Sequence, residues 1–149
     1  MPDADQYNED VVLLAPSSAE TAKQDIPVFF GVSGESSGAQ VLSLNVTSFP
    51  PGGSSNAHMH DGFETAIHHL NGRVAIFYGH SLEDHVVLEP GCFCLIPPNL
   101  PHKAFNLSRS EPANSVTARN DPAEQESVVL TPEADDGSAE RRAADLILD

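Results

Sequence analysis

Short apolar runs, broken at regular intervals by glycine and proline, are the feature that most constrains the fold of this chain. Twelve prolines and ten glycines are spread over 149 residues, and the runs between them are four to eight residues long. Runs of this length at regular spacing are typical of an all-β sandwich or barrel. The expected strands are residues 11–14, 28–32, 40–47, 64–70, 73–78, 85–88, 92–96, 102–106, 115–118 and 127–130.

The length of the chain suits one domain, since two would each lack a sufficient core. We predict an N-terminal extension at 1–25, a β-barrel at 26–131 and an acidic C-terminal tail at 132–149, with a short helix over 139–148. The run 11–14 could serve as an edge strand or cross to a second copy, so a homodimer is expected.

The turn at Asn71-Gly72 lies between two apolar runs. This dipeptide has a strong preference for the two-residue turns that join neighbouring antiparallel strands. The sequence therefore predicts a β-hairpin at this point.

The charge balance excludes several partners. Twenty-two acidic residues against seven lysines and arginines give a net charge of −15, which repels nucleic acid and anionic membrane surfaces. The first ten residues are polar and acidic, unlike a signal peptide, and no apolar run approaches a membrane span.

The two cysteines, Cys92 and Cys94, lie two residues apart. On a strand this spacing gives poor disulfide geometry, so free thiols and a cytoplasmic protein are expected. Packing in the core is favoured over a Cys-x-Cys metal site.

Three histidines and a glutamate have the spacing of a metal site. His58 and His60 are two residues apart, so on a strand both imidazoles leave the same face. Glu64 begins the next apolar run, where a buried carboxylate needs a partner, and His102 begins a later one. Such a ligand set suits one divalent transition metal per chain, which would be Fe, Mn, Ni, Co or Zn.

These residues resemble the first motif of the cupins, which is Gly, five residues, His-x-His, three or four residues, Glu, six residues and Gly. Gly52, His58, His60 and Glu64 match it, but seven residues instead of six separate Glu64 from Gly72. The extra residue indicates a bulge or a one-residue shift, which affects the residues that face inward from 64–70.

The second cupin motif is matched further along the chain. Gly91, Pro97, His102 and Asn106 stand at its positions, with Asn99 in place of a central glycine. Asparagine also tolerates the left-handed backbone conformation, so this replacement is mild.

The resemblance implies a double-stranded β-helix (jelly-roll) barrel with a metal inside, held by His58, His60, Glu64 and His102. It also implies a wide range of activities, because the cupin fold does not specify a reaction. We expect a metal-dependent enzyme that acts on a small oxygenated metabolite, with a dioxygenase-type oxygenase first. The alternatives are a redox-silent isomerase, lyase or polyketide cyclase, and a non-catalytic module that binds a small ligand.

Four further residues could belong to the site. His68 is in phase with Glu64 and could transfer protons inside the cavity, while His69 would face the other way unless the extra residue exchanges their roles. A structural or surface role is favoured for both. An inward Arg73 or Arg119 could hold a substrate carboxylate, but a salt bridge to an acidic neighbour is the preferred interpretation.

Overall fold

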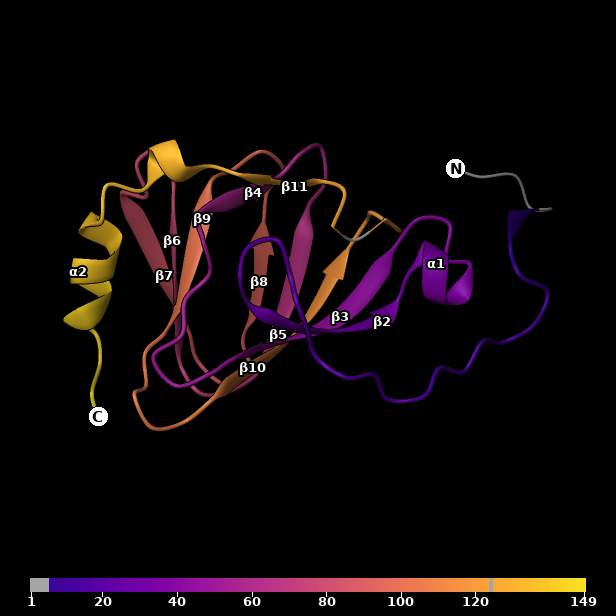
Figure 1. The fold of residues 1–149 in the computed structure, drawn as a ribbon, viewed down its shortest axis with the longest axis horizontal. Helices are drawn as coiled ribbons and strands as arrows, with labels where there is room; N and C mark the ends of the chain where they lie inside the picture. The colour runs from indigo at the N-terminus through magenta and orange to yellow at the C-terminus, as the bar shows by residue number, and fades with distance from the viewer. Residues whose placement is uncertain (1–5, 124) are drawn as a thin grey trace.

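Two antiparallel sheets face each other and form the body of the protein (Figure 1). The computed structural model describes residues 6–123 and 125–149, so residues 1–5 of the predicted extension lie outside the described part. The six-stranded sheet has the order β1 (Glu20–Thr21), β2 (Pro27–Val32), β3 (Ser43–Phe49), β10 (Ala113–Arg119), β5 (Thr65–Asn71) and β8 (Phe93–Ile96). The five-stranded sheet has the order β11 (Val128–Leu130), β4 (His58–His60), β9 (His102–Asn106), β6 (Val74–Tyr78) and β7 (Asp84–Leu88).

This architecture confirms the predicted all-β double-stranded β-helix. Nine of the ten expected strands are present, with ends that differ by a few residues. The exception is 11–14, because residues 11–19 form no strand. Val11 and Leu13 are instead 97% and 94% exposed, since the segment runs out beside the barrel and pairs with no described strand (Figure 1).

The helices are short and lie at the two ends of the barrel (Figure 1). α1 (Gly34–Ser37) was not expected, and a capping box between Ser33 and Ser36 begins it. The helix predicted over 139–148 is α2 (Ser138–Ala144), preceded by the 3-10 helix η2 (Pro132–Ala134).

The predicted hairpin at Asn71-Gly72 is wrong. β5 and β6 lie in different sheets, so this turn carries the chain from one sheet to the other. Gly72 has a φ of +74°, and a Cβ there would approach the Cβ of Ala113 to 2.8 Å. The conformation and the close contact both require glycine.

The core lies between the sheets, and both cysteines pack against it. Cys92 and Cys94 are free thiols that pack at the edge of the main cluster, which confirms the packing interpretation. A second cluster lies under α2, where Ala139 and Ala143 are buried with Phe77. The tail therefore covers one end of the barrel.

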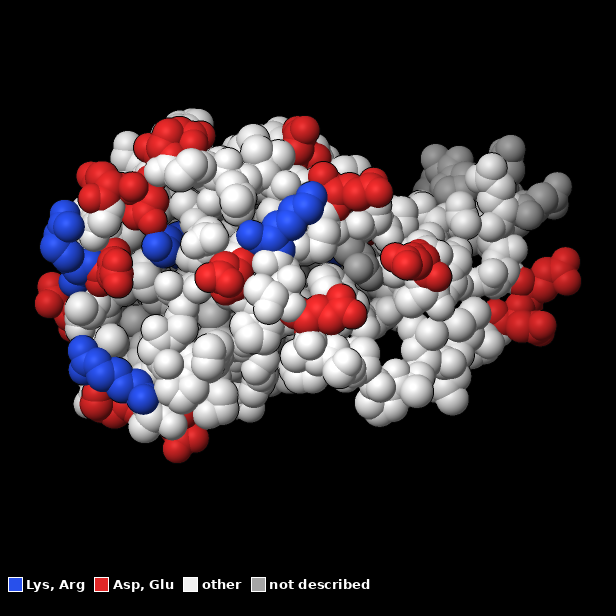
Figure 2. Space-filling view, in the orientation of Figure 1, with Lys and Arg blue, Asp and Glu red and all other residues white. Residues whose placement is uncertain are grey.

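Acidic side chains are spread over much of the surface seen in Figure 2, and lysine or arginine appears at few places. The expectation that the protein avoids nucleic acid stays a prediction. Among the described residues, no helix has the length and apolar character needed to span a membrane.

The exposed apolar side chains of 11–13 lead to a prediction about assembly. We propose that this segment packs on a second copy of the chain, because such side chains are more stable when buried. Light scattering should give about twice the mass of 15.9 kDa, and Leu13→Asp should give the monomer. Leu148→Asp, at a site 83% exposed at the other end, should remain dimeric; a monomeric wild-type protein would contradict the proposal.

Candidate metal centre

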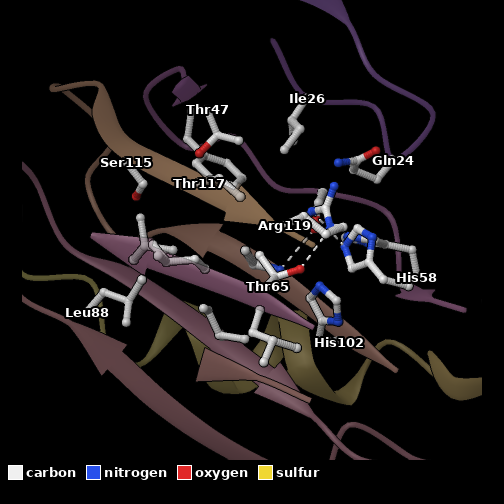
Figure 3. A pocket seen from close by; sticks show the side chains of 18 residues that line it. Gln24, Ile26, Thr47, His58, Thr65, Leu88, His102, Ser115, Thr117 and Arg119 are labelled. Carbon is white, nitrogen blue, oxygen red and sulfur yellow. Dashed lines mark hydrogen bonds between the residues drawn. The ribbon is translucent and has the colours of Figure 1, made fainter. Parts of the chain in front are cut away.

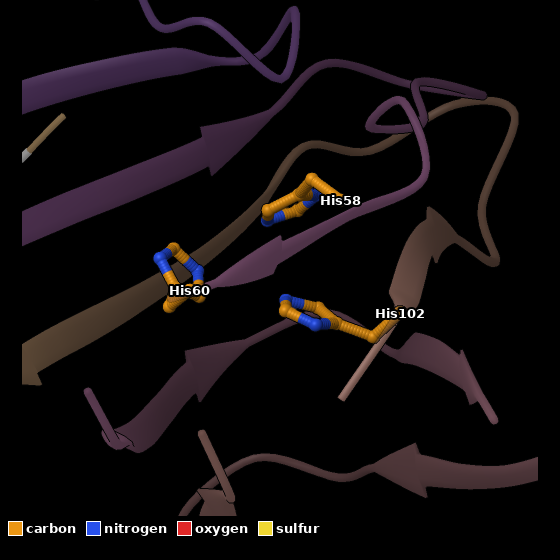
Figure 4. Close-up of side chains that lie close together, drawn as sticks. All are labelled: His58, His60 and His102. Carbon is orange, nitrogen blue, oxygen red and sulfur yellow. The ribbon is translucent and has the colours of Figure 1, made fainter. Parts of the chain in front are cut away.

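Three of the four predicted ligands converge inside the barrel (Figure 4). His58 on β4 pairs directly with His102 on β9, and their ring centroids are 4.2 Å apart. His60 leaves the same face of β4, with its ring 5.4 Å from that of His102. One nitrogen of each ring lies within 4.8 Å of those of the other two, and all three residues are at most 4% exposed.

Backbone carbonyls fix the orientation of two of these rings. Nδ1 of His58 donates to the carbonyl of Asn56 at 2.8 Å, and Nδ1 of His102 donates to that of Leu100 at 3.0 Å. A carbonyl only accepts hydrogen bonds, so each Nδ1 carries the proton. Nε2 of both rings is therefore left with a lone pair that can bind a metal.

The three rings are neutral at physiological pH. Burial, and then the positive charge of Arg119, lowers the pKa of His60 to about 2. Burial is also the main cause that lowers the pKa of His102 to about 4 and the pKa of His58 well below its usual value. Since a metal binds only the neutral imidazole, the cluster is ready to accept one.

The structure does not bring Glu64 into this cluster. Its side chain is exposed, its backbone N–H donates to Asn120 Oδ1 at 3.0 Å, and Thr65 faces the cavity instead. Thr65 is the first paired residue of β5, opposite Arg119. Side chains alternate along a strand, so an inward Thr65 turns Glu64 outward.

The number of residues between His60 and Gly72 is also consistent with Thr65, and not Glu64, as the inward residue. If four residues follow His60, the carboxylate position of the cupin motif falls on Thr65, and six residues then lead to Gly72. This is the one-residue shift that the extra residue indicated.

Arg119 occupies the space beside Thr65 (Figure 3). It is 7% exposed, Nε donates to Thr65 Oγ1 at 2.9 Å, and one terminal nitrogen lies 3.3 Å from Nε2 of His60. Arg119 is thus an inward residue of the site. Arg73, in contrast, pairs with Glu89 at 3.0 Å, which confirms the salt bridge expected for it.

The cluster lies at one end of a cavity of about 60 Å³, enough for a few water molecules or a small ligand. Gln24 and Ile26, from the turn between β1 and β2, cover this end (Figure 3). The side chains around the rest of the cavity are mostly apolar, and they include Phe49, Ile67, Val74, Ile76, Leu88, Ile96 and Ala104.

Neither of the two histidines proposed for proton transfer lines this cavity. His69 faces inward and is fully buried, but Nδ1 pairs with Ser115 Oγ at 2.7 Å and Nε2 with the carbonyl of Gly72 at 2.8 Å. His68 stacks on Phe93, with ring centroids 4.3 Å apart. The one-residue shift has exchanged the two, and each makes structural contacts.

The turn after β8 supports the histidine cluster through two hydrogen bonds made by Asn99. Asn99 has a φ of +61°, so the asparagine adopts the left-handed conformation expected of it. Its N–H donates to the carbonyl of His60 at 3.0 Å, and its Oδ1 accepts the N–H of Gly62 at 2.8 Å.

A family model of the cupin domain matches residues 45–117, a span that holds both motifs and all three histidines. The chain carries a cupin domain. A search of curated proteins found no match to its sequence.

Several solved structures of other proteins share this fold. An oxalate oxidase superposes with a TM-score of 0.67 at 18% identity, over 88% of this chain and 69% of the other. A cupin-superfamily sugar phosphate isomerase from Silicibacter pomeroyi gives 0.55 at 14%, over 71% and 70%. Bacillus subtilis oxalate decarboxylase, which has Mn(II) centres, gives 0.64 at 12%, over 76% and 30%.

The geometry leads to a prediction about metal affinity. Since His102 faces the cluster and Glu64 faces solvent, His102→Ala should weaken Co(II) binding at least about 100-fold. Glu64→Gln should change it less than about twofold. Calorimetric titration of the metal-free variants measures both values, and a large loss in Glu64→Gln would place the carboxylate on the metal.

The low pKa values of the cluster predict acid instability of the metal-free cupin. These histidines bind protons near pH 6.5 when the chain is unfolded, but only at lower pH when it is folded. The unfolded state therefore gains protons first, and stability falls as the pH drops from about 6.5 towards 4. Each histidine contributes up to about 1.4 kcal/mol per pH unit in that range.

Denaturant titrations from pH 7 to 4 measure this loss. Replacing His102 with glutamine should make the free energy of unfolding less dependent on pH, relative to the wild-type protein, because one of the titrating groups is gone. An unchanged dependence would contradict the assignment of a lowered pKa to His102.

Proposed function

We propose that this cupin is a metal-dependent enzyme that acts on a small oxygenated organic metabolite, as an oxygenase of the dioxygenase type. The observation that carries the proposal is the convergence of three neutral imidazoles at the end of a small, mostly apolar cavity. A transition metal held there would polarise a substrate oxygen and, if redox-active, bring substrate and O2 together. The Mn(II) centres of a structural neighbour are consistent with such a metal.

The residues of the chain supply binding, orientation and exclusion of water. His58, His60 and His102 would hold the metal, and the apolar walls would keep bulk water from the reacting atoms. The volume of about 60 Å³ limits the substrate to a small molecule.

The ionisable side chains of the cavity favour an oxygenase over redox-silent chemistry. Among the described residues that line it, these are the three histidines and Arg119. Arginine keeps its proton, and a histidine that binds a metal through one ring nitrogen and is protonated on the other has no lone pair left to accept a proton. A redox-silent isomerase, lyase or cyclase that moves a proton through a side chain would need a further group, which His68 and His69 do not provide here.

Metal content and oxygen consumption test the proposal. Elemental analysis of protein purified without added metal should find close to one divalent transition metal per chain. An oxygen electrode should show uptake with a substrate drawn from small carboxylates, diketones or phenols, and His102→Ala should abolish it. His69→Gln changes a buried histidine that does not line the cavity. If the fold is intact, its rate of oxygen uptake should stay within about threefold of the wild-type rate.

Other results of these experiments would support one of the alternative functions. Product formed without oxygen would identify the redox-silent enzyme. Tight binding of a ligand with no product under any metal or gas would identify a binding module. A protein that takes up none of Fe, Mn, Ni, Co and Zn would contradict all metal-dependent proposals.

A further inference from the structure

We propose that two copies of this chain meet through the outward face of the six-stranded sheet, with β8 of each copy packed against the N-terminal arm of the other. The arm is residues 11–17, which form no strand. This inference goes beyond the proposed function and does not depend on a metal. It extends the expected homodimer from a contact of residues 11–13 to a defined surface with two-fold symmetry.

The outward face of this sheet is largely apolar across five neighbouring strands. Strand pairing places one row of outward residues side by side, which is Phe29, Val46, Val116, His68 and Phe93. A second row beside it has Leu44 on β3 and Leu95 on β8 at its ends. These two rows form the apolar face, on which Phe93 is 82% and Leu95 60% exposed.

The apolar face carries no carboxylate, ammonium or guanidinium group. The five strands contain no aspartate, glutamate or lysine, and their single arginine, Arg119, points inward. Two copies that each have a net charge of −15 repel each other, so they approach with least repulsion where acidic groups are absent. A strongly charged partner would find no group to pair with there. The distribution of charge therefore favours a second copy of the chain.

The other sheet already has a cover, which the chain itself provides. The outward side of β6 packs on α2 in a cluster of buried residues that includes Ala75, Phe77, Ala139 and Ala143, while the inward side of β6 belongs to the core between the sheets. An apolar sheet face is stable when another layer packs on it. Within the described part of the chain no such layer buries Phe93, so the apolar face is the one that a second copy would cover.

A groove beside the apolar face provides the place for β8 of the second copy. The groove has a volume of about 780 Å³ and lies between the N-terminal arm and the sheet, where its walls include Phe29, Leu44, Val46 and Val116. The arm runs below β2 and β3 in Figure 1. The groove is therefore at one side of the sheet, and β8 is the strand at its opposite edge.

A two-fold axis brings the groove and β8 together. Four strand spacings separate β2 from β8, which is about 19 Å. If the axis runs parallel to β10, midway between the two copies, β8 of each copy lies over β2 of the other. Phe93 and Leu95 of one copy then enter the groove of its partner, and the same contact forms twice.

The size of this surface fits a dimer that uses both the face and the arm. The two rows, with the residues between them, cover roughly 300 Å² in flat projection, and soluble monomers rarely expose a contiguous apolar patch above a few hundred Å². A stable dimer buries about 800 Å² per copy. The arm supplies further area, because Val11 and Leu13 are 97% and 94% exposed.

Sedimentation equilibrium of the full-length protein tests the surface. The wild-type protein should be dimeric, and Leu95→Asp should raise the dissociation constant of the dimer at least about 100-fold, as at the centre of other interfaces. Leu130→Asp, at a site 47% exposed on β11 of the other sheet, should stay within about threefold of the wild-type value. Far-UV circular dichroism checks that both variants keep the fold.

Salt distinguishes an apolar interface from one held by ion pairs. Raising NaCl from about 0.05 to about 0.5 M screens the repulsion between two acidic copies, so the wild-type dimer should become tighter. An interface held by ion pairs would become weaker instead.

A double-mutant cycle tests the contact between β8 and the arm. Phe93→Ala and Leu13→Ala should each weaken the dimer, and together they should weaken it at least about fivefold less than the product of the separate effects. Phe93→Ala combined with Leu148→Ala, at the other end of the molecule, should give the simple product.

The contrary results are specific. A monomeric wild-type protein would leave the face to a different partner and overturn the proposal. A dimer that persists in Leu95→Asp but not in Leu13→Asp would rest on the arm alone, and the proposal would be wrong. Weakening by salt, or a Phe93 and Leu13 pair whose effects simply multiply, would contradict it as well. None of these results bears on the metal-dependent function, which metal content tests separately.

Discussion

The site depends on the register between β5 and β10, in which Thr65 lies opposite Arg119. Side chains of a strand alternate between its two faces, so a shift of one residue exchanges every inward group for an outward one. Because Thr65 faces the cavity, the side chain of Glu64 faces water and that of His69 is buried in the interior. The same register places Arg119 beside the histidine cluster, where it donates to Thr65 and contacts His60.

The cluster itself is built by the other sheet and is held by backbone groups. The pairing of β4 with β9 sets His58 against His102, and two carbonyls fix the tautomers of those rings. Asn106, at the end of β9, donates to the carbonyls of Phe49, Pro50 and Glu111. The hydrogen bonds from the two Nδ1 atoms orient the rings of His58 and His102 in the absence of a metal, which favours metal binding.

The surface and the cavity of the protein differ in their charged side chains. The protein has a net charge of −15, with acidic groups over much of the surface seen in Figure 2. Among the described residues that line the cavity, the permanently charged side chain is that of Arg119.

The sequence by itself determined the all-β class, most strands and the three histidines, because these depend on local patterns of two-residue alternation, turn residues and motif spacing. It also contained the departure from the cupin motif, seven residues instead of six between Glu64 and Gly72, which left open which residues of 64–70 face inward. Only the tertiary structure decided between Glu64 and Thr65, turned Asn71-Gly72 from a hairpin into a sheet crossing, and brought Arg119 to His60 from 59 residues away. These features depend on which strands pair and in which register, and pairing between distant strands follows from packing of the whole barrel, not from the residues of any one segment.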